Sequence, residues 1–269
     1  MRKFLLAFGV ILLTLLAACG SDTADEVYTK AIEASEKMES AELTMDIEQN
    51  IEVPSEEATI NQKINMDAEM TLDPLAMYQK GTISMEMDEF PLDVESEMYM
   101  VEDEIFMYDS MTSQWMKMDN SMMPTDMLQN APSTKDQLEM MEEYVEDFEL
   151  EENDDYYVLK LTADGEGFTE LTNQLMEDNF GEQFSQLGVD VTEILENMKV
   201  NNLYIEMNID KETYDVKEQK MDMEMEITAE GESLTIVQKS TTKYTGINTV
   251  DAIEIPQEVK DGAVEGPGF

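Results

Sequence analysis

Apolar and polar residues alternate along most of this chain, and few folds accept that pattern. The alternation runs from about residue 41 to residue 118 and returns from residue 203 to residue 244, with short polar or proline-containing turns between the runs. Because successive side chains of a strand point to opposite faces, each run predicts strands with one apolar face and one polar, mostly acidic face. Strands that follow one another through short turns form an antiparallel meander.

Four stretches repeat their apolar residues at helical spacing instead of alternating. They are Glu26–Glu39, a segment that begins near Ser133, Phe168–Phe180 and Val191–Met198. The first would precede the opening meander, and the others would lie between it and the three closing strands, with one further strand over Tyr156–Leu161. We therefore predict an α+β fold of about ten strands and four helices in one domain.

The start of the chain has the layout of a bacterial export signal. Arg2 and Lys3 form a basic head, an apolar run extends from Phe4 to Leu16, and small residues follow it. The run is shorter than the ~20 residues that a membrane-spanning helix needs. Cys19 comes directly after the small residues and is the only cysteine in the sequence, so it has no partner for an intramolecular disulfide.

The residues Leu-Ala-Ala-Cys-Gly around Cys19 resemble the lipobox of bacterial lipoproteins, in which the thiol is joined to diacylglycerol and the chain is cleaved just before it. The resemblance implies a signal peptide over residues 1–18, an acylated Cys19 with a short tether over 19–25, and one domain over 26–269. Two acyl chains are enough for stable anchoring. The expected location is the outer face of the plasma membrane, with the membrane bound through Cys19.

The order of the predicted elements is similar to that of the LolA and LppX/LprG lipoprotein fold. The closing Ile253-Glu254-Ile255-Pro256 also resembles the end of many uncharacterised Gram-positive lipoproteins, including those of Bacillus type. This resemblance implies a strongly curved antiparallel sheet, a half-barrel, whose helices cover the concave face and enclose an apolar cavity. No ligand-binding motif of those proteins can be carried over to particular positions of this sequence.

The charge and the missing residue types exclude several functions. Sixteen basic residues face 62 acidic ones, and removing Arg2 and Lys3 leaves 14 against 62, a net charge of −48. Nucleic acid is repelled by such a field, so we expect no nucleic-acid partner. The chain has no histidine, and its one thiol is the expected acylation site. We therefore expect no enzyme, no catalytic residue, no metal site of the usual zinc type and no cofactor.

Methionine pairs two residues apart mark several predicted strands, and at this spacing both thioethers point to the same face. Three interpretations stay open: a filled core, a deformable lining for a lipid cavity, or a Cu(I) site, which histidine would usually assist. The candidate lining residues are Ile64, Met66, Met70, Met85, Met87, Met98, Met100, Met223 and Met225 on strands, and Leu138, Met141, Val145, Leu171 and Leu175 on helices.

The sequence thus predicts a non-catalytic extracytoplasmic lipoprotein that binds a lipid or another apolar ligand between its sheet and its helices. The alternative is a structural or protein-interaction lipoprotein with a filled core and no small-molecule ligand. The two differ in whether a continuous cavity lies beneath the helices. No feature of the sequence names a protein partner.

Overall fold

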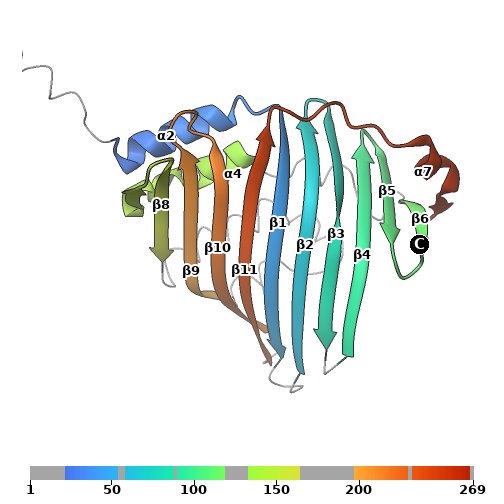
Figure 1. Cartoon of the computed structure of the whole chain (residues 1–269). Coiled ribbons are helices and arrows are strands. Elements are labelled where there is room, and N and C mark those ends of the chain that lie inside the picture. The colour runs from blue at the N-terminus through green and yellow to red at the C-terminus, as the bar shows by residue number, and fades with distance from the viewer. Residues whose placement is uncertain are drawn as a thin grey trace, which may run out of the picture.

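One large sheet dominates the computed structural model, which describes residues 22–53, 58–87, 90–118, 133–163, 197–229 and 232–266. The sheet is open and curved (Figure 1), with the strand order β12-β6-β5-β4-β3-β2-β1-β11-β10-β9-β8-β7. The strands are β1 (Ser40–Val53), β2 (Ala58–Leu72), β3 (Leu75–Met87), β4 (Phe90–Val101), β5 (Glu104–Asp109), β6 (Gln114–Met118), β7 (Glu149–Glu152), β8 (Tyr156–Ala163), β9 (Met198–Asp210), β10 (Val216–Ala229), β11 (Glu232–Ile247) and β12 (Val264–Glu265).

The sheet consists of two meanders that meet at its centre. Strands β1 to β6 follow one another on one side, and β7 to β11 follow one another on the other. The first and last long strands join them, since β1 pairs with β11 from Ala41 opposite Ile247 to Glu52 opposite Thr235. The described pairs are antiparallel, as predicted, except that β12 runs parallel to β6. Figure 1 shows the blue β1 beside the red β11.

The described part of the chain has twelve strands rather than the predicted ten, and it has a C-terminal helix that the sequence did not indicate. The additional short elements are β7, with four residues, and β12, with two. A two-residue period cannot be recognised over so few positions. The tail was expected to end in an extended segment at Pro256, but it continues into α7 (Gln257–Gly262) before β12.

Helix α2 (Ala24–Ser35) begins two residues earlier and ends four residues earlier than predicted. Thr23 caps it, because its hydroxyl accepts from the N–H of Glu26 while the Glu26 carboxylate accepts from the N–H of Thr23. The helix ends early since β1 already starts at Ser40. Its buried residues are Val27, Tyr28 and Ala31.

The helical segment predicted after Ser133 is two short pieces, α4 (Thr134–Met140) and the 3-10 helix η2 (Glu142–Asp147). The predicted helix over Phe168–Phe180 lies outside the described residues, and so does most of the one over Val191–Met198. The end of the latter prediction is wrong, because Met198 is the first residue of β9 and is buried there.

The sheet has two chemically different faces. We call the side that contacts α2, α4 and η2 the inner face, and the opposite side the outer face. Paired residues of neighbouring strands share a face, so the registers place on the inner face Leu43, Met45, Ile47, Ile64, Met66, Met70, Met77, Met98, Met100, Leu203, Ile205, Met207, Met221 and Met223. Asp46, Glu48, Glu206 and Asp222 lie on the outer face, which confirms the predicted alternation.

The main core lies between the inner face of β8–β10 and the three helices that cover it. Val27 of α2, Leu138 of α4, and Leu159 and Met207 of the sheet are buried there. The Tyr28 hydroxyl is buried as well and donates to the Leu138 carbonyl at 2.7 Å. This bond and the apolar contacts hold α2 and α4 together over the same strands.

A second apolar contact lies on the outer face, where the C-terminal segment packs. Ile255 and Val259 of that segment are buried with Phe106 of β5. Trp115 of β6 packs against this cluster, and its ring lies 5.7 Å from the ring of Tyr99. The segment after β11 therefore crosses to the other end of the sheet, as the red trace in Figure 1 shows, and covers the edge of β6 with β12.

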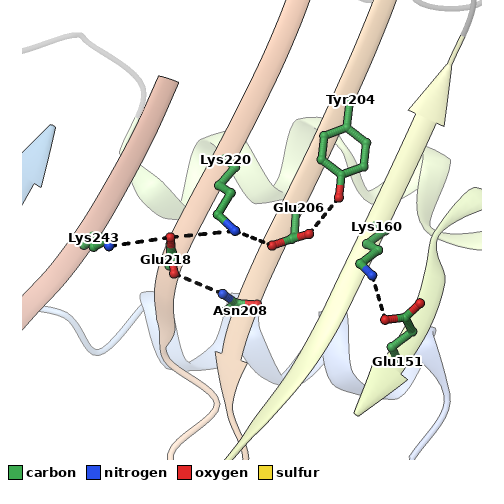
Figure 2. A network of polar contacts seen from close by, with 8 residues as sticks. All are labelled: Glu151, Lys160, Tyr204, Glu206, Asn208, Glu218, Lys220 and Lys243. Atoms are coloured by element: carbon green, nitrogen blue, oxygen red, sulfur yellow. Dashed lines mark hydrogen bonds and ion pairs between the residues drawn. The ribbon is translucent and has the colours of Figure 1, made fainter. Parts of the chain in front are cut away.

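The outer face of β7–β11 carries a network of ion pairs and hydrogen bonds, drawn in Figure 2. Glu206 is at its centre: it accepts from Lys220 at 2.7 Å and from the hydroxyl of Tyr204 at 2.7 Å. Those two bonds hold the pKa of Glu206 below its ordinary value of 4.5, and the bond to Glu206 raises the pKa of Tyr204 to about 12. Lys220 and Lys243 also face Glu218.

We expect Glu206→Gln to lower the free energy of unfolding at neutral pH by about 1 kcal/mol. The loss stays this small because Lys220, the ion-pair partner of Glu206, is half-exposed, and solvent screening weakens the pair. A depressed carboxyl pKa stabilises the fold above the unfolded pKa, and this contribution is lost as pH falls through the folded pKa. Urea titrations should therefore show the difference shrink as the pH falls below 4.5. Glu224→Gln on the same face serves as the control, and an equal loss in both variants would contradict the assignment.

Candidate ligand cavity

A cavity of about 380 Å³ lies between the inner face and the start of α4. Its floor comes from β1, β2, β3, β10 and β11, and its cover comes from the residues around Thr134. Half of the lining is apolar: Met38, Leu43, Met45, Ala68, Met70, Leu72, Met77 and Met221. Five of these eight are methionines, whose unbranched side chains adapt to irregular space.

The other half of the lining is polar but uncharged. It consists of Gln79, Ser133, Thr134, Gln137, Gln219, Ser240, Thr242 and Tyr244. No Asp, Glu, Lys or Arg is among the lining residues in the described part of the chain, although 29% of the whole sequence is charged. The hydroxyls of Thr134 and Tyr244 lie 3.3 Å apart and connect the cover to the floor. Hydroxyl and amide groups therefore surround this hollow together with thioethers.

The strand registers bring the polar groups to one side of the floor. Gln219 of β10 lies opposite Thr242 of β11, and Thr242 lies opposite Met45 of β1. Two residues further along β10, on the same face, Met221 lies opposite Ser240. The polar side chains of β10 and β11 are thus direct neighbours, while the methionines of β1, β2 and β3 form the other side.

The structure distributes the predicted lining residues over several places. Of those within the described residues, only Met70 lines this cavity. Leu138 and Val145 are buried in the main core, with Met141 and Met223 packed against it. Met98 and Met100 are buried in a separate cluster with Ile105. Ile64, Met66, Met85 and Met225 lie elsewhere on the inner face, and Met87 belongs to β3 beside Ile60. Leu171 and Leu175 lie outside the described residues.

None of the polar lining residues, and only Met70 of the apolar ones, was predicted from the sequence. Gln219, Ser240 and Thr242 occupy the apolar phase of the alternation, where a polar residue is the exception. Gln49 and Gln238, which are hydrogen-bonded to each other on the inner face, break the phase in the same way. Polar residues at inward positions are thus the signal that could have marked these strands.

A hollow on the outer face provides a contrast. It measures about 440 Å³ and lies between the C-terminal segment and the stacked rings of Tyr78 and Tyr99. Four carboxylates line it: Glu42, Glu69, Asp251 and Glu254. The acidity of the chain is therefore concentrated outside the inner cavity.

Two further features of the described residues bear on function. None of their helices has the length and apolar character that a membrane crossing requires. They also bring no three side chains of the types His, Cys, Asp and Glu together in a cluster that could hold a metal ion.

The fold and the cavity define a class of protein: a curved, open antiparallel sheet with helices on one face and an uncharged hollow beneath them. Within this class, the chain belongs to the family of unknown function DUF6612, which matches residues 23–264. No curated protein is similar to the chain beyond the level of chance.

Solved structures with a similar arrangement include two mycobacterial proteins. LprF from Mycobacterium bovis is 10% identical, the match covers 87% of this chain and 96% of LprF, and the TM-score is 0.44. The lipoprotein LppX from Mycobacterium tuberculosis is 9% identical, with 86% and 98% covered and a TM-score of 0.46. A DUF1329 family protein from Desulfovibrio piger is 11% identical, with 86% and 96% covered and a TM-score of 0.30.

Proposed function

We propose that this protein is a non-catalytic, lipid-anchored extracytoplasmic protein that binds an uncharged amphipathic molecule in the inner cavity. The observation that carries the proposal is the lining, which combines five thioethers with hydroxyl and amide groups and includes no charged side chain among the described residues. Pockets of roughly 300–1,000 Å³ with mostly apolar walls and a few polar groups are typical of small-ligand sites.

The chemistry of the lining favours an apolar chain joined to a neutral polar group. Each buried methylene contributes ~0.8 kcal/mol, so about ten of them supply roughly 8 kcal/mol, the scale of micromolar binding. The hydroxyls of Ser240 and Thr242 and the amide of Gln219 offer hydrogen bonds to an ester, hydroxyl or amide group. An ionised headgroup would find no counter-charge there, and a buried unpaired charge is costly.

The anchoring part of the proposal rests on the sequence around Cys19. We propose residues 1–18 as the signal peptide, Cys19 as the acylated residue and the remainder as one domain that begins with the segment before α2. Acylation would keep the protein on the extracytoplasmic face of the membrane, where lipids are at hand as ligands. The filled core around Leu138 and Val145 would serve as the rigid support of the cavity.

The expected result of an uptake experiment is saturable, micromolar binding of a fluorescent monoacylglycerol by the delipidated protein. A fatty-acid anion with the same labelled chain should bind at least about tenfold more weakly, because its charge has no partner in the cavity. Thr242→Trp should abolish uptake by filling the floor of the cavity. Thr241→Trp, the neighbouring residue on the outer face of β11, should leave uptake unchanged.

Three outcomes would contradict the proposal. Equal binding of the ester and the anion would remove the argument from the uncharged lining. Equal uptake by both tryptophan variants would place the ligand elsewhere. No uptake by the folded wild type would favour the interaction lipoprotein without a small-molecule ligand.

Titration with Cu(I) in the same preparation tests the thioether alternative, which predicts stoichiometric binding that Met45→Leu and Met77→Leu together abolish.

A further inference from the structure

Three polar side chains from separate parts of the chain meet at the first described residue, Asp22. Its Oδ2 atom accepts from the hydroxyl of Tyr214 at 2.7 Å, from the hydroxyl of Tyr157 at 3.0 Å and from Lys30 Nζ at 3.0 Å. Tyr157 belongs to β8, Lys30 to α2, and Tyr214 to the turn between β9 and β10. We call these four residues the Asp22 corner.

The members of the Asp22 corner also contact one another. Lys30 Nζ donates to the Tyr214 hydroxyl at 3.0 Å and lies 4.6 Å from the centre of its ring. The rings of Tyr157 and Tyr214 are stacked, with centres 5.9 Å apart. The hydrogen bond from Tyr214, and then that from Lys30, hold the pKa of Asp22 below its ordinary value, while hydrogen bonds to Tyr214 and Asp22 raise the pKa of Lys30. Both groups are therefore ionised under physiological conditions.

This arrangement fixes the chain directly in front of α2. Thr23 follows Asp22 and caps the helix, so the backbone at residue 22 is held both by the cap and by the corner. Cys19 is only three residues earlier. Three residues span at most about 11 Å even when fully extended. The Cα atom of an acylated Cys19 would thus lie no further than that from the Cα atom of Asp22.

We infer that the Asp22 corner docks one edge of the sheet against the lipid bilayer instead of letting the domain swing on its anchor. The inference rests on the proposed acylation of Cys19. The partner is the lipid surface itself, because the acyl chains would enter the bilayer from Cys19, whose backbone is within about 11 Å of a residue fixed to β8 and the β9–β10 turn. Tyr157 and Tyr214 suit this place, since tyrosine rings concentrate at membrane–water interfaces.

The docked edge is the edge near the ligand cavity. Strand β10 starts at Val216, directly after the turn that holds Tyr214, and Gln219 and Met221 of the cavity follow on the same strand. At ~3.4 Å per residue, these two positions lie only about 14 and 20 Å from Asp215. In Figure 1 this edge is at the upper left, and the β5–β6 turn is at the lower right. The inferred orientation brings the cavity within reach of membrane lipids.

The test uses the full-length acylated protein in phosphatidylcholine vesicles that contain a lipid with a Ni²⁺-chelating headgroup. Nitroxide labels at Thr213→Cys, in the β9–β10 turn, and at Met111→Cys, in the β5–β6 turn, report their distance from the headgroups through paramagnetic relaxation. Both positions are exposed. We expect several-fold stronger relaxation at residue 213 than at residue 111. Equal relaxation at the two positions of vesicle-bound protein would overturn the inference.

Asp22→Ala and Cys19→Ala separate the role of the Asp22 corner from that of the acyl anchor, with Asp25→Ala as the control. Asp22→Ala should leave the protein folded and vesicle-bound but make the two labels equally accessible to Ni²⁺. Asp25→Ala, which removes a neighbouring carboxylate in the first turn of α2, should preserve the difference. If Asp22→Ala preserves it too, the corner does not orient the domain. Cys19→Ala should abolish vesicle binding, and retained binding by this variant would contradict the proposed anchor instead.

Discussion

Met207→Asp should leave the protein unfolded at room temperature. The Met207 side chain is fully buried on the inner face of β9, between Gln219 of β10 and Leu159 of β8. The substitution removes core packing, which costs about 2–5 kcal/mol, and buries a carboxyl group without a partner, which costs several more. The sum is comparable to the whole stability of an ordinary domain, about 5–15 kcal/mol.

Asn202→Asp is the matched control for this prediction. It introduces the same carboxylate into the same strand, but at an exposed position on the outer face. Its effect on the free energy of unfolding should stay within about 1 kcal/mol, including repulsion from Glu224 opposite. Circular dichroism and urea unfolding of both variants provide the measurement. Two cooperatively folded variants of similar stability would refute the assignment of faces in β9.

Gly81→Val should destabilise the protein by about 3 kcal/mol or more. Gly81 lies in the middle of β3, on the inner face opposite Met66. A Cβ atom there would overlap the carbonyl oxygen of Asn65 and lie 2.7 Å from Met66 Sδ. The sulfur can move, but the carbonyl belongs to the backbone of β2, so the two strands would have to separate.

The control for Gly81 is Gly262, at the end of α7. No atom lies within 4 Å of a Cβ built at this position. Gly262→Ala should therefore change the free energy of unfolding by no more than about 0.5 kcal/mol. The midpoint of thermal unfolding of the two variants gives the comparison. A Gly81→Val protein as stable as the wild type would show that β2 and β3 are further apart than described.

Most of the sheet could be predicted because its strands are long enough for the two-residue period to be unambiguous. The run from Ile60 to Leu72 becomes most of β2, and the run from Met221 to Ile227 becomes half of β10. Helix α2 was also identified, within a few residues at each end. The shorter elements could not be predicted, because the six residues of α7 or of η2 are too few to distinguish a helical period of 3.0 from one of 3.6.

The cavity was harder to predict than the sheet. Alternation tells which side chains share a face, but not which of them a helix will cover. Leu138 and Val145 were predicted to line a cavity, but both are buried in the main core, because α4 and η2 lie directly on β8–β10. Met45 and Met77 line the hollow beside these helices. Such contacts between distant segments depend on how the helices pack on the sheet, and the pattern of a single sequence does not give that information.

The pairing of β1 with β11 has a consequence for the order in which the protein is made. Strand β1 leaves the ribosome before the other strands of the sheet, and its partner on one side, β2, follows at once. Its other partner starts at Glu232, nearly 200 residues later. At a synthesis rate of roughly 5–20 residues per second, the edge of β1 that pairs with β11 stays unpaired for about 10–40 s. The two meanders therefore join only after β11 has been made, and the edge of β1 that pairs with β11 stays unpaired until then.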